Sequence, residues 1–174
     1  MKETFVRRKK EFKGRAVGFR IDEVRLPNGK IATREYLYHP GAVAVIALLG
    51  DKVLMVRQFR YPVGVETWEI PAGKLDAKED PLDCIHRELR EETGYTSGRV
   101  RKLFSFWPTA AFANEVIHLY IADKLKPGKA QPDDDEFLTC KAWPLKKLYA
   151  EIRKGRIRDS KTLIALLAYK ALRP

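Results

Sequence analysis

Three glutamates at helical spacing are the residues of this sequence best suited to chemistry. Glu88, Glu91 and Glu92 stand at positions i, i+3 and i+4, so a helix would carry their carboxylates on one face. Clustered carboxylates repel one another, and their oxygens are the hard ligands that Mg²⁺ and Mn²⁺ prefer. The cluster indicates a divalent-cation site. Taken alone, an acidic helix face that is simply solvated is the commoner interpretation.

A helix over residues 81–93 would position these carboxylates. Asp80 can cap its start, Pro81 suits its first position and Gly94 can end it. The neighbouring apolar residues, which we expect to pack inward, are Leu82, Ile85 and Leu89. The carboxylates would then lie at the border of the core rather than on the far, solvated side.

The residues around the glutamates follow a longer pattern. Gly73 is followed after five residues by Glu79 and after seven more by Arg87. The complete set is Gly73, Glu79, Arg87, Glu88, Leu89, Glu91, Glu92 and Gly94. This pattern resembles the box of the Nudix hydrolase family, and at about 7% usage per residue type it would arise by chance roughly once in 10⁸ windows. Tyr95 departs from the family, which has an aliphatic residue there, but an aromatic ring can fill the same space.

The resemblance implies a metal-dependent hydrolase that cleaves a nucleoside diphosphate linked to another group. Divalent ions would neutralise the diphosphate, lower the pKa of a bound water and stabilise the leaving phosphate. The metal ligands would be Glu88, Glu91, Glu92 and the carbonyl of Ala72, with Glu91 and Glu92 serving catalysis. They would hold roughly two or three Mg²⁺ ions, with Mn²⁺ as an alternative. The residues that would brace the loop and helix are Gly73, Glu79, Arg87 and Gly94.

Motifs outside the box are similar to the ADP-ribose pyrophosphatase branch of the family, over residues 12–170. They occupy residues 39–45, 56–62, 66–73 and 107–115. The substrate contacts that this branch implies are Arg60, Glu69 and Glu115, and the products would be AMP and ribose 5-phosphate. Ala110 stands where the branch has a proline that marks this substrate. Hydrolysis of another nucleotide sugar, such as GDP-mannose, therefore stays open.

An acidic loop follows at residues 133–136, where the family places a general base and a further metal ligand. Asp133 and Asp135 are the candidates, and Glu136 is the alternative with the longer side chain. A solvated turn is the competing interpretation of this loop.

Composition and charge limit the class of protein. The chain has 174 residues, of which 45% are hydrophobic and 33% charged, so we expect a globular core. No apolar run is long enough to cross a bilayer, the first residues lack the apolar region of a signal peptide, and the two cysteines suit a reducing compartment. We expect a cytoplasmic protein that has no contact with a membrane.

The net charge of +11 would attract polyanions. A Nudix-fold module that binds RNA or a nucleotide without cleaving it is the alternative from a different class. Binders of that kind commonly lose box glutamates, and this chain keeps all of them. We therefore expect a small nucleotide diphosphate rather than nucleic acid as the partner.

The order of the expected elements is strands, helix, strands, helices, which predicts an α+β fold. Residues 17–26 and 30–38 would form an N-terminal β-hairpin around Asn28 and Gly29. The resemblance implies a mixed β-sheet between helices, with residues 1–38 forming a homodimer and helping to bind the base, and residues 39–174 forming the hydrolase domain. Further strands are expected at 42–49, 52–59, 104–107, 115–122 and 137–143, and a helix at 144–154. A last helix would run from a cap at Asp159 or Ser160 to Leu172. Its inward residues would be Leu163, Leu166, Leu167 and Leu172.

Overall fold

The computed structural model describes residues 1–131 and 136–172. The chain forms two compact units. The N-terminal unit consists of Met1–Gly41 and Trp107–Val116, and the main unit consists of Ala42–Phe106 and the chain from Ile117 onward. No helix among the described residues combines the length and the apolar character that a membrane crossing requires.

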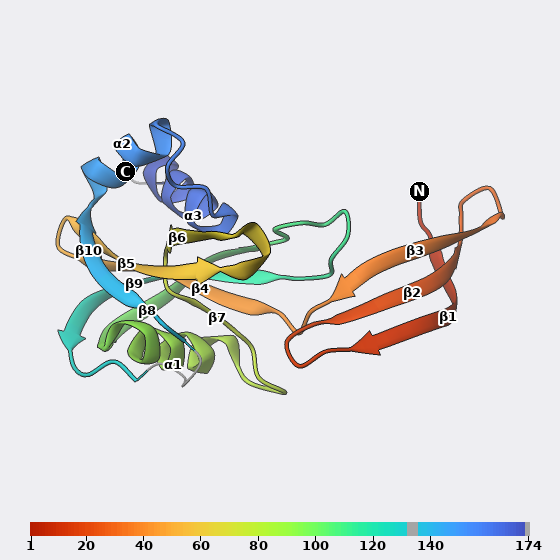
Figure 1. Ribbon diagram of the computed structural model, residues 1–174, viewed down its shortest axis with the longest axis horizontal. Helices are drawn as coiled ribbons and strands as arrows, with labels where there is room; N and C mark the ends of the chain where they lie inside the picture. Colours follow the sequence, from red (N-terminus) through yellow and green to blue (C-terminus); the bar gives the residue numbers. More distant parts are fainter. Residues whose placement is uncertain (132–135, 173–174) are drawn as a thin grey trace. The chain divides into compact units, whose positions relative to one another are not determined.

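A mixed β-sheet forms the centre of the main unit (Figure 1). Its strands are β4 (Ala42–Leu49), β5 (Lys52–Arg60), β6 (Val65–Glu69), β7 (Ala72–Lys74), β8 (Tyr95–Phe106), β9 (Ile117–Pro127) and β10 (Thr139–Pro144). They run in the order β10-β5-β4-β9-β8, with β6 paired to β5 and β7 paired to β4. The β4–β9 pair is parallel and the others are antiparallel.

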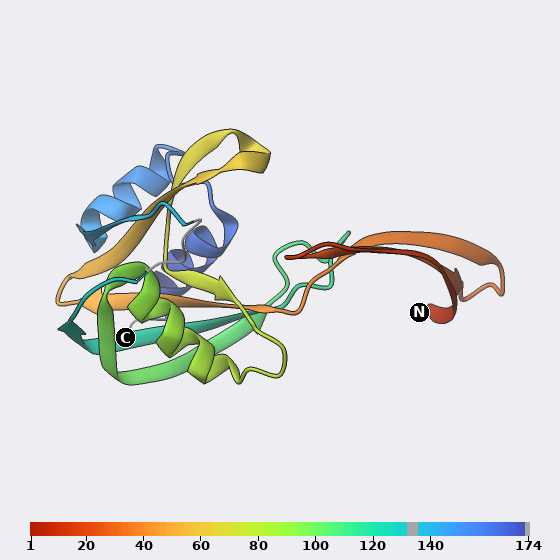
Figure 2. The same ribbon diagram turned by 60° about the horizontal axis from the view of Figure 1, so that its bottom comes forward.

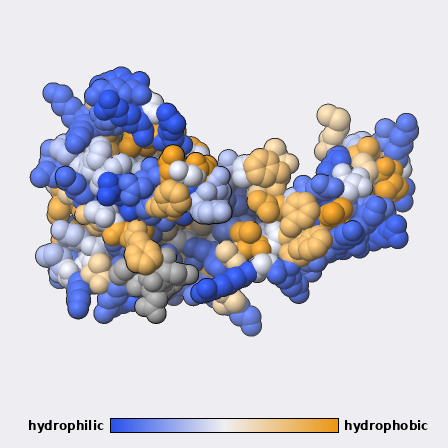
Figure 3. Space-filling model, viewed as in Figure 1, coloured by the Kyte–Doolittle hydropathy of each residue, from blue (hydrophilic) through white to orange (hydrophobic). Residues whose placement is uncertain are grey.

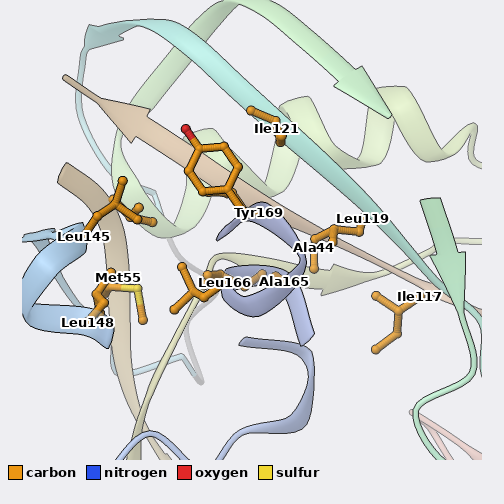
Figure 4. Close-up of a cluster of buried hydrophobic side chains, with 13 residues drawn as sticks. Ala44, Met55, Ile117, Leu119, Ile121, Leu145, Leu148, Ala165, Leu166 and Tyr169 are labelled. Carbon is orange, nitrogen blue, oxygen red and sulfur yellow. The ribbon is translucent and has the colours of Figure 1, made fainter. Parts of the chain in front are cut away.

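Helices cover both faces of this sheet, which confirms the predicted α-β-α sandwich (Figure 2). The helices are α1 (Pro81–Thr93), α2 (Leu145–Arg153) and α3 (Ser160–Ala171). Alternate residues of β4 point to opposite faces. Val43 and Val45 pack with α1, whereas Ala44 and Ile46 pack with α2 and α3 (Figure 4). Burial on both faces explains why β4 is apolar throughout.

Helix α1 has the predicted bounds. The carboxylate of Asp80 accepts a hydrogen bond of 2.8 Å from the amide of Leu82, and Gly94 ends the helix at a φ of 76°. The expected apolar stripe was wrong in one position. The side chain of Leu82 is exposed, and Cys84 joins Ile85 and Leu89 in the core instead.

The buried face of α3 also differs from the expected one. Thr162, Ala165, Leu166 and Tyr169 are buried, whereas Leu167 and Leu172 are exposed. The reason is a tertiary contact: the hydroxyl of Thr162 accepts a hydrogen bond of 2.9 Å from the amide of Ile70, which turns this side of α3 toward the sheet. Because α3 has apolar residues all round, its periodicity could not determine its orientation.

The N-terminal unit is a three-stranded antiparallel sheet in the order β1-β2-β3. Strands β2 (Gly18–Arg25) and β3 (Ile31–Tyr38) are the two predicted strands, and β1 (Thr4–Lys13) adds a third. Strand β1 was not predicted because it is exposed along its whole length and rich in basic residues. The segment Trp107–Val116 joins the edge of β3, where the amide of Leu37 donates to the carbonyl of Phe112.

Candidate active site

Glu92 lies almost fully buried at the inner end of the acidic face of α1. Its side chain accepts a hydrogen bond of 3.0 Å from the amide of Ala72, and the residue is 4% exposed. Burial, together with the charge of Glu88, raises its pKa well above the ordinary value for a carboxyl group. The carboxylate form of Glu92 is therefore stabilised by any positive charge that comes within reach.

Glu88 lies beside Glu92 in a space that only a glycine leaves open. Burial raises the pKa of Glu88 to about 7, against the opposing effect of Arg87. A Cβ atom on Gly73 would lie 1.8 Å from the carboxyl carbon of Glu88. A side chain at position 73 would thus displace this carboxylate. This steric conflict explains why the box has glycine at this position.

Arg87 connects three acidic groups on α1 and the loop before it. Its Nε and Nη2 donate to the two oxygens of Glu79 at 2.9 and 3.0 Å. Its Nη1 donates to Glu88 at 2.8 Å and to Glu91 at 2.9 Å. The hydrogen bond from Arg87 lowers the pKa of Glu79 to about 2. Glu79 is therefore fully ionised and tied to the helix, while Glu91 stays partly exposed.

The segment after β9 packs against the end of α1. A Cβ atom on Gly94 would lie 2.7 Å from the amide nitrogen of Ala130, and the amide of Gln131 donates to the carbonyl of Glu91 at 3.0 Å. The charge of Glu136 raises the pKa of both Glu88 and Glu92. Two of the candidate bases, Asp133 and Asp135, lie outside the described residues.

The acidic face of α1 has the donor set that a divalent cation requires. Its oxygen atoms come from Glu88, Glu91 and Glu92, and burial disfavours the charged form of two of these groups in the absence of a cation. Within residues 1–131 and 136–172 no group of three metal-binding side chains is already assembled. Arg87 instead donates to one oxygen of Glu88 and to one oxygen of Glu91.

A second charged network lies around Glu69, at the end of β6. Its carboxylate accepts hydrogen bonds from Arg60 Nε at 2.7 Å and Nη2 at 2.5 Å, from the hydroxyl of Thr67 and from Lys161 Nζ. Burial by itself would raise the pKa of Glu69, but Arg60 and Lys161 outweigh burial and lower it to about 2. With both oxygens engaged by protein donors, Glu69 holds Arg60 in place.

This network opens into a cavity of about 860 Å³ between β6 and the start of α3. Pro62, Val63, Val65 and Trp68 provide its apolar wall, and Arg60, Arg156, Arg158 and Lys161 provide its basic residues. The two charged regions influence one another: the charge of Lys161 opposes the rise in the pKa of Glu92. The basic residues after α2 were missed because no local pattern distinguishes them from solvated lysines and arginines.

Glu115 belongs to the N-terminal unit. It lies 3.8 Å from the ring of His39, and the neighbouring Asn114 accepts a hydrogen bond of 2.7 Å from the amide of His39. The predicted site residues that the structure describes therefore lie on α1 with the segment from β7 that leads to it, in the Arg60–Glu69 network and in this segment of the N-terminal unit.

Comparison with known proteins agrees with this geometry. Residues 38–166 match the family model of the NUDIX domain. The chain is 44% identical to the methanol dehydrogenase activator of Bacillus methanolicus, over 94% of this chain and 90% of that protein. It is 37% identical to the ADP-ribose pyrophosphatase of Bacillus subtilis (strain 168), over 95% of this chain and 91% of that protein. It is 34% identical to the GDP-mannose pyrophosphatase of Citrobacter koseri, over 83% of this chain and 82% of that protein.

A solved structure described as an ADP compounds hydrolase has the same fold. Its TM-score is 0.86, at 18% sequence identity, covering 98% of this chain and 94% of that chain. The mixed sheet between helices, the glutamates of α1 and the match over residues 38–166 lead to one conclusion. The chain belongs to the NUDIX family of hydrolases.

Proposed function

We propose that this protein hydrolyses the diphosphate bond of ADP-ribose to AMP and ribose 5-phosphate, with Mg²⁺ or alternatively Mn²⁺ as cofactor. The observation that carries the proposal is the grouping of Glu88, Glu91 and Glu92 on one face of α1. The side chains of Glu88 and Glu92 are buried on this face, and Arg87 joins Glu88 to Glu91. Such groups favour a divalent cation, and the 37% identical ADP-ribose pyrophosphatase supports the substrate.

The residues of the chain would then have distinct roles. Glu88, Glu91, Glu92 and the carbonyl of Ala72 would hold roughly two or three ions, which neutralise the diphosphate and activate water when bound. Arg87, which donates to Glu79, Glu88 and Glu91, would brace the loop and the helix.

Substrate contacts and the general base complete the proposal. Arg60, oriented by Glu69, would bind the diphosphate, and Glu115 would contact the sugar. The proton of the attacking water would pass to an acidic residue of the loop, for which Asp133, Asp135 and Glu136 are the candidates. We place the reaction in the cytoplasm, where nucleotide substrates are available.

The direct test is incubation of the purified protein with ADP-ribose and Mg²⁺, followed by chromatography. We expect AMP and ribose 5-phosphate in equal amounts, and no products when EDTA is present. Folded protein that forms no AMP with either Mg²⁺ or Mn²⁺ would disprove the proposal.

Hydrolysis of another nucleotide sugar is the second candidate. Ala110 departs from the motif of the ADP-ribose branch, and a 34% identical relative is a GDP-mannose pyrophosphatase. Comparison of kcat/KM for ADP-ribose and GDP-mannose under the same conditions decides between them. A higher value for GDP-mannose would replace ADP-ribose as the substrate.

A 44% identical relative is a methanol dehydrogenase activator, so activation of a dehydrogenase is a further candidate role. This role is compatible with either hydrolysis. The test is the initial rate of a methanol dehydrogenase with and without this protein. The Glu92→Gln variant would show whether any activation requires an intact acidic face.

We also propose a homodimer that forms through the N-terminal unit. Phe12, Phe19 and Leu37 stand in one row across its three strands, and Phe12 is 58% exposed. Figure 3 shows hydrophobic residues among hydrophilic ones on this sheet. A single layer of three strands buries little apolar surface by itself, so a second copy would supply the missing layer.

Light scattering on the intact chain tests the dimer. We expect the mass of a dimer for the wild type and for Lys10→Ser, which changes an exposed basic residue of β1. Phe12→Ser should shift the mass toward the monomer. A monomeric wild type would disprove this proposal without affecting the hydrolase assignment.

A further inference from the structure

The cavity beside Glu69 contains more positive charge than its own acidic residues neutralise. Its lining includes Arg60, Arg156, Arg158 and Lys161, against three acidic residues, Glu66, Glu69 and Asp159. The cavity also has an apolar wall that contains Trp68. A basic wall facing an apolar wall suits a ligand that carries a phosphoryl group on a sugar or nucleoside.

Each acidic residue of the cavity already has a basic partner or a capping role. Glu66 lies 3.6 Å from Arg57. Glu69 accepts from Arg60 and Lys161. Asp159 accepts from Lys161 at 2.9 Å and caps α3 through the amide of Thr162 at 3.0 Å. Each acidic side chain is therefore engaged with a partner other than Arg158.

Arg158 is a basic residue of the cavity that none of these acidic side chains binds. Within the part of the chain that the structure describes, its side chain forms no ion pair, and its one hydrogen bond runs from Nε to the carbonyl of Gly155 at 3.1 Å. That bond anchors the guanidinium and leaves Nη1 and Nη2 available. Arg156, in contrast, is bound to Glu151 at 3.1 Å.

We infer that Arg158 is a specificity-determining residue that binds a phosphoryl group of the substrate in this cavity. The inference rests on the proposed function and deepens it, because ADP-ribose hydrolysis leaves a phosphoryl group on each product. Arg60 is held by Glu69 on the same cavity, so Arg60 and Arg158 would grip the substrate from two elements. The fork of a guanidinium suits phosphate oxygens, which a lysine would bind less specifically.

The test compares Arg158→Ala with Arg153→Ala, which removes an exposed arginine in the last turn of α2 outside the cavity lining. We expect Arg158→Ala to raise KM for ADP-ribose about tenfold with kcat within about twofold. Arg158→Lys should recover part of the loss. Arg153→Ala should behave as wild type. An unchanged KM in Arg158→Ala would overturn the inference.

Binding of the separate products, measured without divalent ions, identifies the phosphoryl group and does not depend on hydrolysis. Ribose 5-phosphate and AMP are titrated against each variant, and thermal melting reports their dissociation constants. Weaker binding of ribose 5-phosphate alone in Arg158→Ala places Arg158 on the sugar side, and weaker binding of AMP alone places it on the nucleotide side. Either result supports the inference, whereas wild-type binding of both overturns it. If the wild type forms no AMP from ADP-ribose, the proposed function fails, and these titrations still report on Arg158.

Discussion

Glu92 and Glu69 are both almost fully buried, at 4% and 1% exposure, yet their pKa values move in opposite directions. Burial disfavours the charged form of both carboxyl groups and by itself would raise both pKa values. Glu69 meets Arg60 and Lys161, which outweigh burial, whereas Glu92 has Glu88 as its neighbour and a single amide as its donor.

The comparison separates two uses of a buried carboxylate. The carboxylate of Glu69 is itself satisfied within the protein by Arg60, Thr67 and Lys161, so this group orders its surroundings. On α1 the negative charges exceed the positive ones, with Arg87 shared among Glu79, Glu88 and Glu91. A buried excess of negative charge is unfavourable without a cation, and this supports our proposal that α1 holds the metal site.

The largest effect is expected from Glu92→Gln. The amide can keep the hydrogen bond from Ala72 but loses the charge that would hold a cation, so kcat should fall about 1000-fold. Thermal stability without Mg²⁺ should stay equal or rise, because an uncompensated buried charge is removed. Hydrolysis assays and melting curves check both, and a variant with wild-type turnover would contradict the assignment of α1.

Glu69→Gln should lower the stability of the fold, beyond any effect on substrate binding through Arg60. It leaves Arg60 and Lys161 without their shared carboxylate, and breaking a buried ion pair costs about 3 kcal/mol. Glu66→Gln is the matched control, since its side chain is 55% exposed and its pair with Arg57 is loose, and we expect a change within about 0.5 kcal/mol. Urea unfolding measures both free energies. Equal effects would show that burial does not distinguish these pairs.

The pH dependence of Glu69 has a definite sign. Its pKa is about 2 in the folded protein, against an ordinary value of 4.5 that applies to the unfolded chain, so the unfolded chain binds more protons between these values. Its contribution of about 3 kcal/mol is therefore present above pH 4.5 and is lost as the pH falls toward 2. The difference in unfolding free energy between wild type and Glu69→Gln should shrink over this range. A difference independent of pH would contradict the ion-pair account.

Gly73→Ala should lower activity by disturbing the acidic face of α1, without disturbing the contacts of Glu69. The new Cβ atom would collide with the carboxyl group of Glu88, and displacement of this ligand should lower kcat/KM at least about tenfold. Gly98→Ala is the control, because its Cβ atom would meet its nearest neighbour, Lys124, at an ordinary 3.8 Å. Steady-state assays of the two variants decide, and similar losses in both would mean that the contact with Glu88 is not the cause.

The smallest effect is the response of stability to Mg²⁺. A cation that binds only the folded protein, at about ten times its dissociation constant, contributes about 1.4 kcal/mol, or a rise in Tm of about 3 °C. Glu69→Gln should retain this rise and Glu92→Gln should lose most of it. Calorimetry with and without Mg²⁺ measures the shifts, and a rise retained in Glu92→Gln would place the cation elsewhere.

Local patterns predicted the elements around the site well. Asp80, Pro81 and Gly94 determine the bounds of α1 through bonds formed within a few residues, so the sequence contains the whole signal. Strand β1 was missed because it is exposed along its whole length and rich in basic residues. The orientation of Leu167 was missed because α3 is apolar all round and a contact with the distant Ile70 helps to orient the helix.

The sequence by itself determined that a short helix carries clustered glutamates between two glycines, because capping and helical spacing are local properties. Only the tertiary structure decided what these charges experience. Gly73 on β7 meets Glu88 on α1, and Lys161 reaches Glu69 across 92 positions. Burial and electrostatic pairing depend on such distant neighbours, and they decide which glutamate is satisfied within the protein and which is left for a cation.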